Sequence, residues 1–83
     1  MSDSEIIWKF LSREFTDEHP VIYLYVTNRP RSSKNALDKV VNEAKLIFGD
    51  VYPDSLIKPV VERFLQSKRK DYMCGKLQVK PIY

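Results

Sequence analysis

Basic side chains lie in two clusters, and their types suit contacts with phosphate groups. The first cluster occupies TNRPRSSKN, residues 27–35, and contains Arg29, Arg31 and Lys34. Arginine presents a planar fork of N–H donors that matches phosphate oxygens, and the first turn of a helix adds unpaired backbone N–H groups. The segment has no glycine with which to wrap a phosphate as a P-loop does. It therefore predicts either a phosphate contact or only the serine-capped start of a helix.

The second cluster is SKRKDYMCGK, residues 67–76. Its cations, with one more beyond it, are Lys68, Arg69, Lys70, Lys76 and Lys80. Cations in the last turn of a helix stabilise its negative end without any ligand. If the terminal segment pairs with residues 21–26, the two clusters form one basic stripe that includes Tyr72 and Tyr83, which suits contact with a nucleic-acid backbone and stacking on bases. The alternative is scattered, solvated charge, because acidic residues occur in the same segments.

Tyrosines indicate a second kind of surface. Tyr23 and Tyr25 alternate with aliphatic residues in VIYLYV, residues 21–26, so in a strand they share one face of a sheet. An uncovered aromatic face is typical of a protein interface or a dimer seam. The terminal segment KLQVKPIY, with Tyr83, offers in addition an edge strand for pairing with a partner.

Catalytic and metal chemistry is not indicated. His19 is the single histidine and lies in the turn TDEHP, and Cys74 is the single cysteine. Nucleophilic or acid–base catalysis needs a nucleophile, a base and an orienting group in convergent positions. One cysteine forms no disulfide within the chain and excludes a cysteine-based structural zinc site. We therefore predict a protein that is not an enzyme and has no catalytic residues, metal or cofactor.

Composition predicts one folded domain, residues 1–83, because 43% of the residues are hydrophobic and 12% aromatic. The net charge is +3. The longest apolar run, VIYLYV, is far shorter than the roughly 20 residues of a membrane helix, and the polar start MSDSE does not have the layout of a secretory signal. We expect no membrane partner and an intracellular location, cytoplasmic or nuclear.

Hydrophobic periodicity predicts the elements that position these residues. Residues 2–15 suit a helix with Ser2 and Glu5 at capping-box spacing, although the β-prone IIWKF leaves a strand as the alternative. Residues 21–26 suit a buried strand. Residues 36–48 have helical spacing, including an inward Ile47, and Gly49 stands at the C-cap.

The second half of the chain contains a further helix and a β segment. The helix is predicted to begin near Pro59, because proline lacks the N–H for an interior bond, and to run to Lys70. Its outward residues are Arg63, Gln66, Ser67 and Lys70. Gly75 marks a turn, and residues 77–79 alternate as a strand does.

This order predicts an α+β fold: helix, strand, helix, helix, then a β hairpin or strand. A winged helix has the same order and places its third helix in the DNA major groove. If residues 4–15 are a strand, a ββααβ two-layer sandwich results. We expect a small basic nucleic-acid-binding domain, for DNA rather than RNA, in which Arg63, Gln66 and Ser67 face bases. The alternative is a protein-interaction module, a small subunit or inhibitor of a larger complex, or a homodimer.

Overall fold

Four α-helices make up the secondary structure of the chain in this computed structural model, which describes residues 2–27 and 30–78 and, for residues 30–33, the backbone alone. The helices are α1 (Asp3–Glu14), α2 (Pro20–Val26), α3 (Pro30–Phe48) and α4 (Asp54–Met73). No strand occurs in the described ranges. The α+β prediction is therefore wrong, and so are the winged helix and the ββααβ sandwich.

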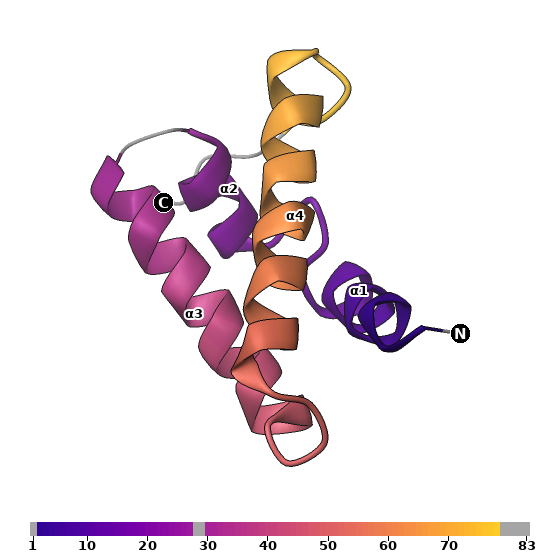
Figure 1. Ribbon diagram of the computed structural model, residues 1–83. Coiled ribbons are helices and arrows are strands. Elements are labelled where there is room, and N and C mark those ends of the chain that lie inside the picture. Colours follow the sequence, from indigo (N-terminus) through magenta and orange to yellow (C-terminus); the bar gives the residue numbers. More distant parts are fainter. Residues whose placement is uncertain (1, 28–29, 79–83) are drawn as a thin grey trace.

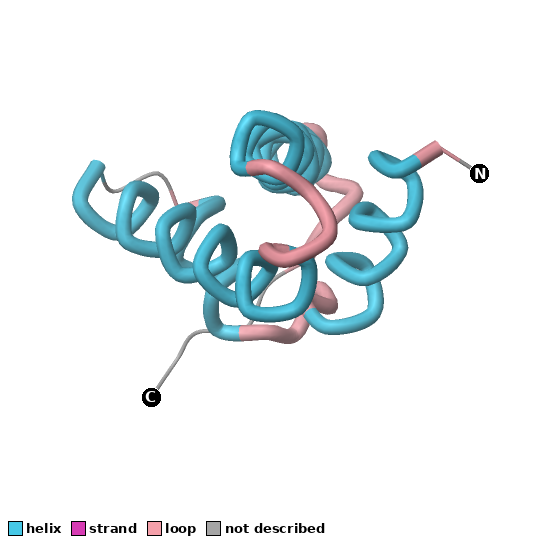
Figure 2. Tube along the Cα trace, turned by 60° about the horizontal axis from the view of Figure 1, so that its bottom comes forward, coloured by secondary structure: helices cyan, strands magenta, loops and turns pink. Residues whose placement is uncertain are grey.

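The two long helices, α3 and α4, form an antiparallel pair joined by a tight turn, and α1 lies on the other side of α4 from α3 (Figure 1). Figure 2 shows α4 above, with α3 and α1 on either side below it. The short α2 packs against both α3 and α4, while α1 contacts α4 and α3. None of the described helices is both long and apolar enough to cross a membrane.

The core lies where the four helices meet and is built from aliphatic and aromatic side chains. It contains Ile7, Leu11, Phe15, Val21, Ile22, Tyr25, Val26, Ala36, Val40, Val41, Ala44, Ile57, Val60, Val61, Phe64, Leu65 and Leu77. Edge-to-face aromatic pairs join the helices at its margin. The ring centroids of Trp8 and Phe64 are 5.5 Å apart, and those of Phe10 and Phe48 are 5.3 Å apart. Such pairs add to the burial energy of α1 on α4 and of α1 on α3.

Helix α1 confirms the helical interpretation of its segment. The Ser2 hydroxyl oxygen accepts a hydrogen bond from the Glu5 backbone N–H at 3.3 Å, as the N-cap of a capping box does. Ile7 and Leu11, four residues apart, are fully buried. The strand alternative for this segment is therefore excluded.

Helix α2 replaces the predicted strand at residues 21–26. His19 is its N-cap, and its Nδ1 accepts a hydrogen bond from the Val21 backbone N–H at 3.1 Å. Pro20 follows in the first turn, where its missing N–H costs no hydrogen bond. A segment that is apolar at every position has no period of its own. A helix satisfies its backbone within the segment, whereas a strand needs a neighbour, and the described chain provides none.

Helix α4 begins five residues before the predicted start. Asp54 is its first residue, and Pro59 lies inside it, with fully buried Ile57 before it and Val60 after it. The proline removes one interior hydrogen bond, a cost of about 3 kcal/mol. Burying Ile57 on the core offsets part of that cost, since a fully buried aliphatic side chain contributes about 1.5–3 kcal/mol.

Glycines follow both long helices: Gly49 was predicted as a C-cap, whereas Gly75 was predicted only as a turn after a helix ending at Lys70. The Gly49 N–H donates to the Lys45 carbonyl at 2.8 Å, and a Cβ at Gly49 would clash with that carbonyl oxygen. Gly75 has φ of 80°, and beyond it the Lys76 N–H donates to the Asp71 carbonyl at 2.8 Å, which makes a Schellman motif. The turn brings Leu77 back onto the core at 6% exposure. Residues 77 and 78 form no strand, and residue 79 lies outside the described residues.

Candidate interaction surface

Two of the predicted phosphate-binding cations, Lys68 and Arg69, contact residues in earlier parts of the chain. Lys68 Nζ lies 2.7 Å from Asp17 Oδ1 and 5.5 Å from the centre of the Phe64 ring. Arg69 Nη2 donates to the Tyr25 carbonyl oxygen at 3.1 Å, and its guanidinium carbon lies 4.3 Å from the centre of the Tyr25 ring. Carbonyls at a helix C-terminus carry partial negative charge, so Arg69 caps α2.

The remaining predicted basic residues lie on several elements. Arg63, Gln66, Ser67 and Lys70 are exposed on one face of α4. Lys34 is exposed near the start of α3, and Lys76 is exposed beyond α4. Arg29 and Lys80 lie outside the described residues, and Arg31 is in α3 with no side chain described. The pairing of strands that was expected to join the two clusters is absent, because residues 21–26 form α2.

The predicted tyrosine face does not exist either. Tyr25 is 7% exposed and packs in the core, whereas Tyr23 is half-buried. Residues two apart share a face in a strand but point in nearly opposite directions on a helix. Tyr83 lies outside the described residues. A protein interface must therefore be found elsewhere on the molecule.

An exposed aliphatic surface at the end of α3 was missed in the sequence. Leu46, Ile47 and Val51 are 80%, 57% and 69% exposed, and we call these three residues the α3-end patch. Helical spacing assigned Ile47 to the inner face, but α3 extends beyond the helices that cover its other apolar residues. The sequence did contain one indication of this surface. Leu46 is apolar, yet it does not share the helical spacing of the residues that are buried in α3. Scattered exposed leucines are ordinary, but three large aliphatic residues in a six-residue span form a patch.

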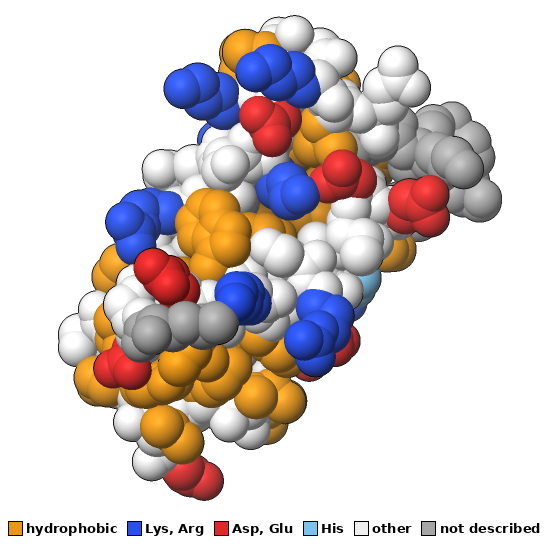
Figure 3. Space-filling model, turned by 90° about the vertical axis from the view of Figure 1, so that its right-hand side faces the viewer, with side chains coloured by type: hydrophobic (Ala, Val, Ile, Leu, Met, Phe, Trp, Pro, Cys, Tyr) orange, Lys and Arg blue, Asp and Glu red, His pale blue; other side chains and the backbone are white. Residues whose placement is uncertain are grey.

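A groove of about 340 Å³ lies between α1 and the end of α3. It is lined by Ile6, Lys9, Phe10, Arg13 and Phe48, and we call it the α1–α3 groove. The four α1 residues follow i, i+3, i+4, i+7 spacing and so lie on one helical face. Phe48 follows Ile47 in the sequence, so the groove and the patch are at the same end of α3. Figure 3 shows hydrophobic side chains gathered in the lower part of the face that includes α1, with Lys and Arg side chains above them.

The turn between α3 and α4 is fixed by polar and aromatic contacts. Lys45 Nζ lies 3.0 Å from Asp54 Oδ2 across the turn. The rings of Phe48 and Tyr52 are 5.7 Å apart. Burial raises the pKa of the Tyr52 phenol, and the Asp3 carboxylate raises it further by its charge and by a hydrogen bond. Tyr52 therefore links the turn to the start of α1, beside the patch.

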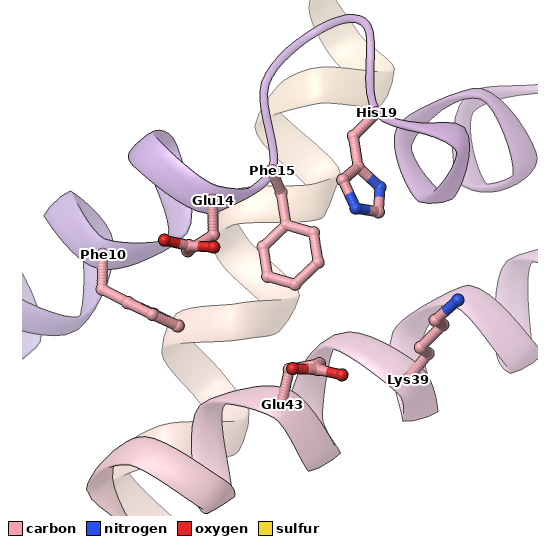
Figure 4. Close-up of a pocket in the computed structure, with 6 residues that line it drawn as sticks. All are labelled: Phe10, Glu14, Phe15, His19, Lys39 and Glu43. Atoms are coloured by element: carbon pink, nitrogen blue, oxygen red, sulfur yellow. The ribbon is translucent and has the colours of Figure 1, made fainter.

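A second pocket, of about 280 Å³, lies farther along the contact between α1 and α3 (Figure 4). Its lining residues are Phe10, Glu14, Phe15, His19, Lys39 and Glu43. The His19 ring lies against the Phe15 ring, with 4.9 Å between centroids, and its Nδ1 is already the acceptor of the α2 cap bond. This pocket contains no hydroxyl or thiol nucleophile.

Metal binding and thiol chemistry find no support in residues 2–27 and 30–78. No three His, Cys, Asp or Glu residues in these ranges are grouped so as to hold a metal ion. Cys74 is exposed at the C-cap of α4, far along that helix from the groove. Comparisons with protein-family models, curated proteins and solved structures find no match for this chain.

Proposed function

We propose that this chain is a protein-interaction module whose docking surface combines the α3-end patch and the α1–α3 groove. The observation that carries the proposal is that Leu46, Ile47 and Val51, which lie within six residues of sequence, are all exposed. Covering apolar surface is favourable by about 25 cal/mol per Å², so a partner that removes these side chains from water gains binding energy. The module acts by binding alone and has no catalytic role.

The size of a stable interface supports joining the patch to the groove. A specific protein–protein contact buries about 800 Å² on each partner, which is about a seventh of the 5792 Å² surface of this chain. Three aliphatic side chains cannot supply that area alone. The groove is at the same end of α3 and adds aromatic surface from Phe10 and Phe48, and aromatic side chains are enriched at the centres of interfaces.

The rigidity of the surface also favours binding. The patch lies at the end of a 19-residue helix and in the turn after it, which is held by the Lys45–Asp54 ion pair and by the tilted contact between the Phe48 and Tyr52 rings. Ordering a loop on binding costs free energy, and a surface that is already ordered avoids this cost.

The proposal is tested by site-specific photo-crosslinking in the native cell. A photoreactive phenylalanine analogue replaces Val51 in the patch, and in a matched variant it replaces Gln66, which is exposed on the polar face of α4. Adducts are then digested with protease or with nuclease. Each variant is first checked by circular dichroism to be folded.

We expect a protease-sensitive adduct of defined mass from position 51 and none from position 66. An adduct of twice the chain mass identifies a second copy as the partner. Absence of any protein adduct from position 51 overturns the proposal. A nuclease-sensitive adduct from position 66 alone shows that the polar face of α4 is the functional surface.

Binding to nucleic acid is the second candidate, favoured by one observation. Arg63, Gln66, Ser67 and Lys70 are all exposed at i, i+3, i+4, i+7 spacing on α4, as the sequence predicted. Labelled duplex DNA and single-stranded RNA are titrated at about 50 and 200 mM salt, over which phosphate-mediated affinity falls by orders of magnitude. Arg63→Glu with Lys70→Glu should abolish such binding, and an affinity that does not change with salt contradicts it.

A further inference from the structure

Charged side chains surround the second pocket, between α1 and α3, in an order that specifies a ligand. We propose that this pocket binds a small zwitterion, with an ammonium group and a carboxylate at the two ends of a short hydrocarbon chain. Its volume of about 280 Å³ is slightly below the roughly 300 Å³ at which pockets for drug-sized ligands begin, so a smaller molecule fits. Of the described residues, only Phe10 lines both this pocket and the α1–α3 groove, and binding here does not depend on the docking surface proposed above.

Two carboxylates from different helices line the pocket and attract a cation. Glu14 is the last residue of α1, and Glu43 lies in α3 (Figure 4). Neither carboxylate has an ion pair or a hydrogen bond with the part of the chain that the structure describes. Glu14 also lies at the negative end of the α1 dipole, where an acidic side chain is unfavourable. A bound ammonium group therefore relieves a repulsion that is present in the free protein.

The cation that suits this pocket is organic and not a metal ion. His19 is the third potential metal ligand in the lining, yet the described residues contain no three His, Cys, Asp or Glu side chains grouped so as to hold a metal. The rings of Phe10 and Phe15 also line the cavity and offer apolar surface. Covering apolar surface favours a ligand with a hydrocarbon chain, whereas a hydrated metal ion gains nothing from it.

The end of the pocket nearest α2 attracts an anion. Lys39 is exposed one helical turn before Glu43, and lysine placed N-terminal to glutamate is the weaker order for an i, i+4 ion pair. These two side chains do not pair with each other in the structure. His19 Nδ1 accepts the Val21 backbone N–H, so the neutral ring carries its proton on Nε2, which is a hydrogen-bond donor. Figure 4 shows His19 and Lys39 at this end, where a bound carboxylate has both an ammonium and an imidazole N–H as partners.

The separation of the two ends sets the length of the ligand. The helical turn from Lys39 to Glu43 is about 6 Å long, so the ammonium and the carboxylate of the ligand are about this far apart. A simple α-amino acid holds both groups on one carbon and cannot reach both ends. The chain of 6-aminohexanoate is long enough, and a lysine residue at the C-terminus of a protein has the same chain between the same two groups.

NMR titration of the isotope-labelled full chain measures the binding of 6-aminohexanoate, 1-aminohexane and hexanoate. The second and third probes have the same hydrocarbon chain with one charge each. A zwitterion of this size should bind with a Kd of about 1–10 mM, so each probe is added to about 20 mM at constant ionic strength. The Val21 amide signal reports on the pocket, because this N–H donates to His19.

The variants each remove one charge from an exposed position. Glu14→Gln, Glu43→Gln and Lys39→Gln alter the pocket, and Asp38→Asn is the matched control, since Asp38 is exposed on α3 and does not line the pocket. Each pocket variant should weaken 6-aminohexanoate about two- to five-fold, as the loss of an exposed ion pair requires, and the control should leave affinity unchanged. Glu14→Gln should not lower Tm, because it removes an acid from the negative end of the α1 dipole.

We expect 1-aminohexane and hexanoate each to bind at least about five-fold more weakly than 6-aminohexanoate. A peptide that ends in lysine distinguishes the two sources of the zwitterion. Tighter binding of this peptide than of 6-aminohexanoate, lost when its C-terminus is amidated, identifies a protein C-terminus as the ligand. Weaker binding of the peptide identifies a free small molecule.

Absence of any signal change up to about 20 mM 6-aminohexanoate overturns this inference. So does a singly charged probe that binds as tightly as the zwitterion, a pocket variant with wild-type affinity, or a tightly bound lysine peptide that amidation does not weaken. Circular dichroism checks that each variant is folded. None of these results affects the adduct expected from position 51, so the proposed function is tested separately.

Discussion

Replacing Arg69 with methionine tests whether this cation stabilises the fold through its contacts with Tyr25. The side chain donates to the Tyr25 carbonyl oxygen at 3.1 Å and covers the Tyr25 ring at 4.3 Å. Methionine keeps the apolar stem that packs on α2 but loses the charge and the donor. The adjacent Lys68→Met is the matched control, because it removes a cation whose partner Asp17 has a side chain 53% exposed.

The expected cost follows from these two contacts. A hydrogen bond from a charged donor contributes about 1.5–3 kcal/mol, and a cation–π contact at a partly buried site about 0.5–2 kcal/mol. Because one guanidinium makes both contacts, the contributions do not simply add, and we expect a loss of about 2–3 kcal/mol. The whole domain has a stability of about 4–12 kcal/mol. Lys68→Met should cost less than about 1 kcal/mol, as exposed ion pairs do.

Urea denaturation followed by circular dichroism measures both variants. In thermal melts, Arg69→Met should lower Tm by about 10–20 °C, since about 1 kcal/mol shifts Tm by about 4–8 °C in a domain of this size. Arg69→Lys should lie between methionine and the wild type, because lysine keeps the charge but not the planar fork. A melt of Arg69→Met within a few degrees of the wild type, or a larger effect from Lys68→Met, refutes the assignment.

Three further predictions concern the caps and the turn. Gly75→Ala should cost about 1 kcal/mol in urea denaturation through left-handed backbone strain alone, because open space surrounds its Cβ position, and Gly75→Asn should cost less; equal stabilities contradict this. His19→Ala should cost about 1 kcal/mol by the same measurement, and His19→Asn should restore most of it as a good N-cap; no rescue by asparagine contradicts the capping role. The pKa of Tyr52 is raised in the folded chain, so the stability that its neutral phenol contributes is complete below about pH 10 and is lost as pH rises through the raised value. In urea denaturation the wild type should therefore lose stability relative to Tyr52→Phe above about pH 10, and Asp3→Asn should reduce this loss; a difference between the two that does not change with pH contradicts the reasoning.

Local signals in the sequence predicted the helices α1 and α3, the C-cap at Gly49 and a turn at Gly75. Ser2 with Glu5 marks the start of α1, and the spacing of residues 36, 40, 41 and 44 marks the buried face of α3. These signals succeed because capping and amphipathic burial depend on residues within one or two turns. The outward face of α4 was predicted correctly for the same reason, even though its start was not.

Local signals gave wrong predictions in two segments whose residues are compatible with more than one secondary structure. VIYLYV is apolar throughout and β-prone. It forms a helix because the described residues offer no neighbouring strand and because Val21, Ile22, Tyr25 and Val26 fit the core. Pro59 is a helix breaker in isolation, yet burial of residues on both sides of it keeps α4 continuous. Tertiary burial outweighed propensity in both segments.

The sequence by itself predicted a helix over residues 36–48 and favoured a helix over residues 2–15, and α3 and α1 lie there. Only the tertiary structure decided which cations are available to a partner. Lys68 meets Asp17 and Arg69 meets Tyr25 across 51 and 44 residues of sequence, so these pairs depend on how α4 packs on the chain before it. The same packing leaves Leu46, Ile47 and Val51 uncovered. Helical periodicity tells which residues share a face, but the length of the neighbouring helices decides whether that face is covered.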